Sequence, residues 1–119
     1  MATVDDEKIS TSFKIPEFDL KRENYVTWRA KFRAVAKMKG FLEALKKGGN
    51  SNMPASESAP RSTDADTKKL EEKAIKENDV AMAYLIQAMS TSRGMRTIHK
   101  GKSTDWPEGL AHKVMEYLH

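Results

Sequence analysis

Hydrophobic and basic side chains form two separate rows along residues 25–39. The hydrophobic row advances by three or four residues at a time, the spacing that places side chains on one face of an α-helix. It consists of Tyr25, Trp28, Phe32, Val35 and Met38 or Lys39. The basic row advances by four residues and consists of Arg29, Arg33 and Lys37. Since no strand explains both rows at once, the pattern predicts an amphipathic helix, with Asn24 or Asp19 as its N-cap.

An extended segment is expected before this helix. Phe13, Ile15 and Phe18 alternate around Pro16, a pattern typical of extended chain that packs a few side chains onto a domain. Residues 1–12 show no apolar periodicity, so we expect them to be disordered.

The helix is expected to break at Gly40, because a glycine inside a helix costs about 1 kcal/mol relative to alanine. A second short helix is predicted over residues 41–46, ended by Gly48 and Gly49. Its inward-facing side chains would be Phe41, Leu42 and Leu45. Residues 48–63 are rich in glycine, serine, proline and asparagine and predict a flexible loop.

The longest predicted helix covers residues 64–89. Thr63, Asp64 and Asp66 are its candidate caps. Its first half carries lysine and glutamate at four-residue spacing, which is typical of a solvated helix face. Its second half is expected to be buried on most sides, and its hydrophobic residues are Val80, Ala81, Met82, Tyr84, Leu85, Ile86, Ala88 and Met89.

Two shorter helices are predicted at the C-terminal end. One begins at Ser92 and ends at Gly101, and the other has Pro107 in its first turn. The residues at the entrance of the second are Ser103, Thr104 and Asp105, the candidate caps, and Trp106. Its apolar face would consist of Leu110, Val114, Tyr117 and Leu118. No stop signal precedes His119, so we expect this helix to continue in a longer polypeptide.

No segment beyond residues 13–18 alternates as a strand would, so the sequence predicts a small all-α domain. The chain has 119 residues, of which 39% are hydrophobic and 32% charged, so the ordered core is expected to be smaller than the chain. There is no cysteine, which excludes disulfides, zinc knuckles and cysteine nucleophiles within these residues. No apolar run approaches the roughly 20 residues needed to cross a bilayer, and residues 1–12 lack a signal-peptide pattern. We therefore expect a soluble intracellular protein.

The formal net charge of +4 is distributed unevenly. Residues 21–47 hold nine lysines and arginines against two glutamates, a net charge of +7, and the remainder sums to −3. Such a local excess favours anionic partners, nucleic acid first. The basic row therefore has three interpretations: a solvated face, a nucleic-acid contact or a contact with an acidic protein. The aromatic row could stack bases, but its helical spacing favours core, since a small domain needs large rings to bury enough surface.

No residue pattern indicates catalysis or a cofactor. His99, His112 and His119 lack the spacing of metal ligands. The glutamates of the long helix alternate with lysines, as on a solvated face, and no glycine pattern forms a phosphate-binding loop. We expect no enzyme, no metal site and no small-molecule substrate.

Three segments carry a family resemblance. Residues 13–19, 24–28 and 39–45 read FKIPEFD, NYVTW and KGFLEAL, and in this order they resemble the N-terminal Gag region of copia-type LTR retrotransposons. Further matches fall at residues 78–81, 84–86 and 104–111, so that the resemblance covers residues 13–119. Two positions depart from the family pattern: Leu20 stands where glycine usually follows the aspartate, and His112 stands where tryptophan is expected.

The resemblance implies a small helical bundle similar to retroviral capsid N-terminal domains. Its core would contain Phe18, Tyr25, Trp28, Phe32, Phe41, Leu45, Leu85 and Trp106. The implied function is structural: copies of Gag assemble into a cytoplasmic virus-like particle that packages element RNA, without membrane contact. Two alternatives stay open. One is a nucleic-acid-binding helical module that uses Arg29, Arg33 and Lys37, and the other is a host-domesticated, capsid-derived adaptor that binds a protein partner.

Overall fold

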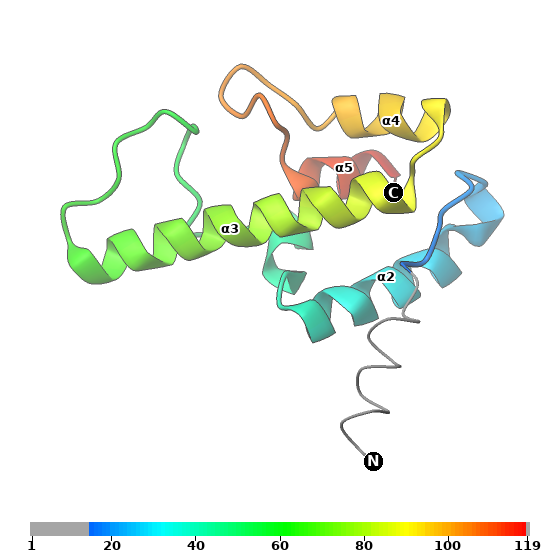
Figure 1. The fold of residues 1–119 in the computed structure, drawn as a ribbon, viewed down its shortest axis with the longest axis horizontal. Helices are drawn as coiled ribbons and strands as arrows, with labels where there is room; N and C mark the ends of the chain where they lie inside the picture. The colour runs from blue at the N-terminus through cyan, green and yellow to red at the C-terminus, as the bar shows by residue number, and fades with distance from the viewer. Residues whose placement is uncertain (1–14, 119) are drawn as a thin grey trace, which may run out of the picture.

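The longest helix, α3, crosses the molecule, with α2 on one side of it and α4 on the other (Figure 1), while α5 packs against α3, α4 and η2. The computed structural model describes residues 15–118. Its elements are η1 (Arg22–Asn24), α2 (Tyr25–Lys39), η2 (Leu42–Leu45), α3 (Ala65–Ala88), α4 (Ser92–His99) and α5 (Ala111–Leu118). Residues 15–118 contain no strand, which confirms the all-α prediction for this range. The predictions for residues 1–12, Phe13 and His119 lie outside the described residues.

Helix α2 ends where the sequence predicts. Gly40 takes a left-handed φ of 84°, and its N–H donates to Ala36 O at 2.8 Å, which closes the last turn. The short helix that follows, η2, is a 3₁₀ helix. Its Leu45 is buried, as is Phe41 just before it.

Asn24 stands at the N-cap of α2, but its side chain does not cap the helix. The side-chain amide donates instead to Asp19 Oδ2 at 2.7 Å, while Asp19 Oδ1 accepts from Lys21 N. The prediction of a capping role for Asn24 was therefore wrong. The physical reason is that η1 precedes α2, so Asn24 already has helical backbone angles, whereas a capping residue needs extended ones.

The hydrophobic row of α2 faces the core for most of its length. Trp28, Phe32 and Val35 are buried, and Tyr25 is half-buried against them. Met38 is 61% exposed, so its assignment to the core row was wrong. A chain of ring contacts extends this row across the domain, with centroid separations of 4.8–5.9 Å, and runs through Phe18, Trp28, Phe32, Phe41 and Tyr84.

The lead-in before η1 is fixed to the domain at two points. The N–H of Phe18 donates to Ala88 O at 2.9 Å, at the end of α3. The indole Nε1–H of Trp28 donates to Pro16 O at 2.9 Å. Residues 15–21 are non-helical, and Phe18 is buried, so the prediction that the lead-in packs onto the domain is confirmed for residues 15–18.

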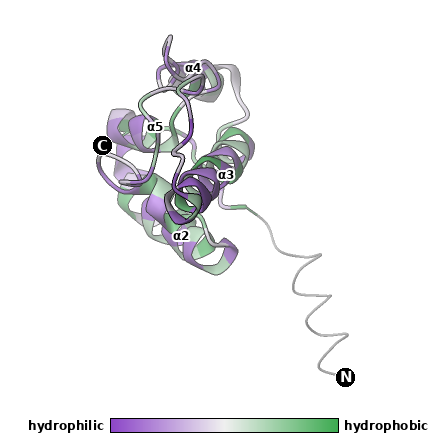
Figure 2. Ribbon diagram, turned by 90° about the vertical axis from the view of Figure 1, so that its left-hand side faces the viewer, coloured by the Kyte–Doolittle hydropathy of each residue, from purple (hydrophilic) through white to green (hydrophobic). Residues whose placement is uncertain are grey.

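Asp64 is the cap of α3, as one of the candidates predicted. Its side chain accepts from the N–H of Thr67 at 3.0 Å. Ala81, Met82 and Leu85 in the second half of α3 are buried, but Ile86 is 39% exposed, so this half is less enclosed than predicted. The first turns of α3 are mostly hydrophilic (Figure 2).

The last helix, α5, begins at Ala111, and the prediction that it begins near Pro107 was wrong. Ser103 Oγ accepts from Trp106 N at 3.1 Å, as a cap would, but Ser103 N also donates to Trp106 O. These two bonds close a turn, and Gly109 then takes a φ of 99°, which a helix cannot contain. Of the predicted apolar face, Leu110 and Val114 are buried, whereas Tyr117 is 60% exposed.

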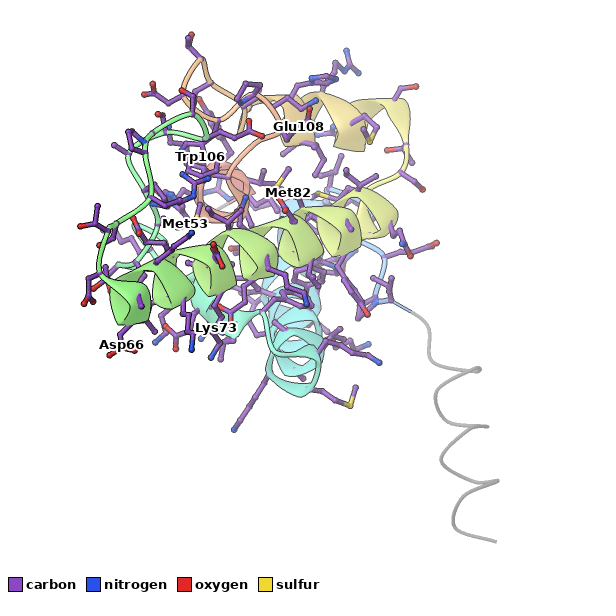
Figure 3. The ribbon with its side chains drawn as sticks, turned by 60° about the vertical axis from the view of Figure 1, so that its left-hand side comes forward. Met53, Asp66, Lys73, Met82, Trp106 and Glu108 are labelled. Carbon is purple, nitrogen blue, oxygen red and sulfur yellow. The ribbon has the colours of Figure 1, made fainter. Side chains whose placement is uncertain are left out.

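Trp106 is buried but does not belong to the main core cluster. It lines a separate cavity of about 340 Å³ beneath the 48–63 loop, together with Met53 and Pro54. Figure 3 shows Met53 and Trp106 on the same side of α3, with Lys73 on the opposite side. The loop has no helix or strand, and its Glu57 N donates to Asp105 O at 2.8 Å. Its flexibility stays a prediction.

Candidate functional site

A groove of about 630 Å³ forms where the lead-in, η1 and the first half of α2 meet α4 and the end of α5. We call it the basic groove. The residues that line it before α3 are Phe18, Leu20, Arg22, Tyr25, Val26 and Arg29. Those that line it after α3 are Arg93, Thr97, Lys100, Tyr117 and Leu118.

Both walls of the basic groove are attached to the same end of α3. The lead-in is hydrogen-bonded to Ala88, the last residue of α3, and α4 starts at Ser92. Thr91 caps α4 by accepting from Gly94 N at 3.1 Å. A Cβ on Gly94 would overlap the backbone carbonyl of Met89, so glycine allows this close approach. The short connection therefore sets α4 against the end of α3, and with it one wall of the basic groove.

The charge of the basic groove is of one sign. Arg22, Arg29, Arg93 and Lys100 line it, and no aspartate or glutamate among residues 15–118 does. Within residues 15–118, none of these four cations forms an ion pair with a carboxylate, since the ion pairs there join Lys46 to Glu43 and His112 to Glu116. Uncompensated cations beside one another create a positive potential that attracts anions.

Tyr25 lines the basic groove and is half-buried. Burial raises the pKa of its phenol above the ordinary value, while the charge and hydrogen bond of Arg29 and the charge of Arg33 act in the opposite direction. The phenol is therefore neutral near pH 7. Arg29 and Arg33 thus both lie close enough to Tyr25 to affect its ionisation.

Tyr117 offers an exposed aromatic ring at the edge of the basic groove. The ammonium of Lys100 lies 5.5 Å from its ring centroid, which is within the range of a cation–π contact. Val26, which also lines the groove, is 76% exposed. The groove thus combines cations with exposed apolar and aromatic surface.

The three residues that the sequence singled out for nucleic-acid contact do not all line the basic groove. Arg29 lines the basic groove, and Arg33 is half-buried near Tyr25. Lys37 is exposed near the C-terminal end of α2 and does not line the groove. The structure places Arg29 beside Arg22, Arg93 and Lys100, none of which the basic row predicted.

A signal for these missed residues does exist in the sequence. Residues 92–102 contain Arg93, Arg96, Lys100 and Lys102 and no acidic residue. That second basic segment folds beside the first one only through tertiary contacts. Sequence periodicity within one helix therefore could not pair them.

A larger cavity, of about 830 Å³, lies against the lead-in and the first half of α2. Glu17, Asp19 and Lys31 line it, so its charges are mixed, and its volume alone does not indicate a ligand. No group of three or more histidine, cysteine, aspartate or glutamate residues among residues 15–118 could hold a metal ion. Within the same range, no helix is both long and apolar enough to span a membrane.

No protein-family model, no curated protein and no solved structure matches this chain.

Proposed function

We propose that this chain is a capsid-type structural domain related to copia-type Gag, and that it assembles with further copies of itself without catalysing a reaction. The observation that carries the proposal is that aromatic residues from separate segments of the resemblance pack into one core. Phe18, Trp28 and Phe41 come from three separate motif segments, yet together with Phe32 their rings form one continuous row of contacts.

Leu20 gives this proposal a second support. It departs from the family pattern, in which glycine follows the aspartate. Leu20 has a φ of 67° and is the one non-glycine residue among residues 15–118 with a positive φ. The left-handed conformation is the one in which glycine is ordinary and leucine is strained. The backbone at Leu20 is therefore shaped as the family's glycine would allow.

In this proposal the domain contributes to a virus-like particle that forms in the cytoplasm and encloses element RNA. Assembly needs surface contacts between copies, and large apolar side chains outside the core are the natural candidates. Those that are exposed are Val26, Met38, Leu70, Ile86 and Tyr117. Single exposed apolar residues are common in monomers, so their part in assembly needs a direct test.

Static light scattering over a micromolar to millimolar concentration range tests the proposal. We expect the average mass to rise above the 13.4 kDa of one chain as the concentration increases, and to fall again on dilution. Replacing each exposed apolar residue by serine, one at a time, should lower the mass at a fixed concentration for at least one position. Ala83→Ser is the matched control, because Ala83 is exposed on α3 and small. A constant mass of one chain at every concentration would contradict self-assembly by this domain.

A further inference from the structure

We propose that the basic groove binds single-stranded nucleic acid, with phosphates held by Arg22, Arg29 and Arg93 and a base stacked on Tyr117. This activity goes beyond self-assembly, because a domain can form a shell without contacting nucleic acid itself. It also differs from the interpretation of α2 alone, since two of the three phosphate-binding residues lie outside that helix.

The charge of the basic groove selects a polyanion. Its four cations come from η1, α2, the first turn of α4 and the C-cap of α4, and no carboxylate among residues 15–118 lines the groove. Holding like charges together opposes folding, so a fold that converges them without counter-charges favours an anionic ligand. Arginine, the residue at three of the four positions, binds phosphate oxygens in a bidentate manner that lysine cannot match.

The aromatic residues of the basic groove select an unpaired strand. A base can stack on an exposed ring only when it has left its own stack, as in single strands and loops. The ring of Tyr117 is 60% exposed and is not part of the core cluster. Lys100 lies 5.5 Å from its centroid and so can meet the phosphate next to the stacked base.

The dimensions of the basic groove suit such a ligand. Its volume of about 630 Å³ lies within the roughly 300–1,000 Å³ of typical ligand sites. The proposed contacts are to phosphates and base faces, and none is to the ribose. The proposal therefore applies to single-stranded RNA and single-stranded DNA alike.

Fluorescence anisotropy with labelled oligonucleotides of one mixed sequence tests the charge argument. The probes are single-stranded RNA, single-stranded DNA and the DNA duplex. We expect both single strands to bind more tightly than the duplex, and salt to weaken binding steeply. The double variant Arg29→Glu with Arg93→Glu should lose at least about tenfold in affinity, and its log–log salt slope should be smaller by about 1.4, for two lost phosphate contacts.

The matched control is Lys68→Glu with Lys69→Glu, on the exposed first half of α3. It changes the net charge by the same amount but lies outside the basic groove. Its affinity should stay within about twofold of the parent chain. Equal losses in the two double variants would overturn the proposal, because binding would then depend on total charge and not on this groove.

Tyr117 tests the stacking argument. Tyr117→Ala should weaken single-strand binding by at least about fivefold, whereas Tyr117→Phe should keep it, since the ring remains. Circular dichroism melts of all variants verify that each is folded, which the exposure of Arg29, Arg93 and Tyr117 favours. No binding of either single strand at low salt, or unchanged binding by Tyr117→Ala, would overturn the proposal as stated.

Discussion

The side-chain oxygen of Asn78 accepts a hydrogen bond of 2.9 Å from the backbone N–H of Ala111, the first residue of α5. The amide of the same side chain donates to Gly109 O at 3.0 Å. Asn78 is 4% exposed and lies in the middle of α3. One buried side chain thus fixes the start of a helix that lies 33 residues further along the chain.

We predict that Asn78→Ala destabilises the domain by about 2–3 kcal/mol, because it leaves a buried N–H and a buried carbonyl without their partner. Urea denaturation followed by circular dichroism measures this change. Gln87→Ala, at an exposed position of the same helix, is the control and should change the stability by less than about 0.5 kcal/mol. Similar midpoints for the two variants would show that Asn78 does not hold α5.

Leu20 is expected to tolerate glycine unusually well. Its left-handed backbone costs leucine roughly 1–2 kcal/mol, and glycine removes that strain while losing the contacts of a half-buried side chain. Leu20→Gly should therefore change the free energy of unfolding by less than about 1 kcal/mol. Leu42→Gly, a half-buried leucine in η2, should cost at least about 2 kcal/mol. Equal costs in urea denaturation would contradict the assignment of strain to Leu20.

Trp28 should control how firmly the lead-in is held. Trp28→Phe keeps an aromatic ring against Phe18 but removes the bond from Nε1 to Pro16 O, worth about 1 kcal/mol. We expect faster amide exchange at Phe18, whose N–H donates to Ala88 O, as measured by NMR. Trp106→Phe should change the exchange rate at Phe18 no more than its effect on global stability explains, because Trp106 lies outside the main core cluster. Equal acceleration of amide exchange at Phe18 in both variants would contradict a local role of Trp28 in holding the lead-in.

We predict that protonation of Glu116 in acid makes the domain less stable. A hydrogen bond from His112, 2.6 Å from Nδ1 to Oε2, lowers the pKa of Glu116, with further contributions from the N–H of Gly48 and the charge of Lys47. Because the folded-state pKa is the lower one, this contribution is present at neutral pH. It is lost as the pH falls below about 4.

Glu116→Gln should accordingly be less stable than the parent chain at neutral pH, and the difference should shrink as the pH falls below about 4. Thermal melts at several pH values measure this. Glu72→Gln is the control, since Glu72 is exposed on the solvated half of α3 and should show no such convergence. A difference that is constant with pH would sink the assigned role of Glu116.

The sequence predicted α2 and α3 because their determinants are local. The hydrophobic row with Trp28 and Phe32, the break at Gly40 and the cap at Asp64 all act within a few residues of the elements that they define. The start of α5 was mispredicted because its partner, Asn78, belongs to another helix. Local signals around Pro107 describe a turn and a helix start equally well.

The residues of the basic groove, too, could be predicted from the sequence only in part. Arg29 was visible as part of a basic row, but Arg93 and Lys100 become its neighbours only when α4 folds against the end of α3. Lys37, one of the three predicted contact residues, lies on the same helix yet outside the groove. Charge periodicity predicted the basic face of the helix. Only the tertiary structure determines which of its charged side chains lie in the groove.

Electron microscopy of the concentrated protein tests the central claim, self-assembly of a capsid-type domain, most directly. The chain should be imaged over a series of concentrations, with and without single-stranded RNA. Our account predicts closed or tubular particles of uniform curvature that appear above a threshold concentration and disappear on dilution. Dispersed single chains at every concentration, or only amorphous aggregates, would contradict it.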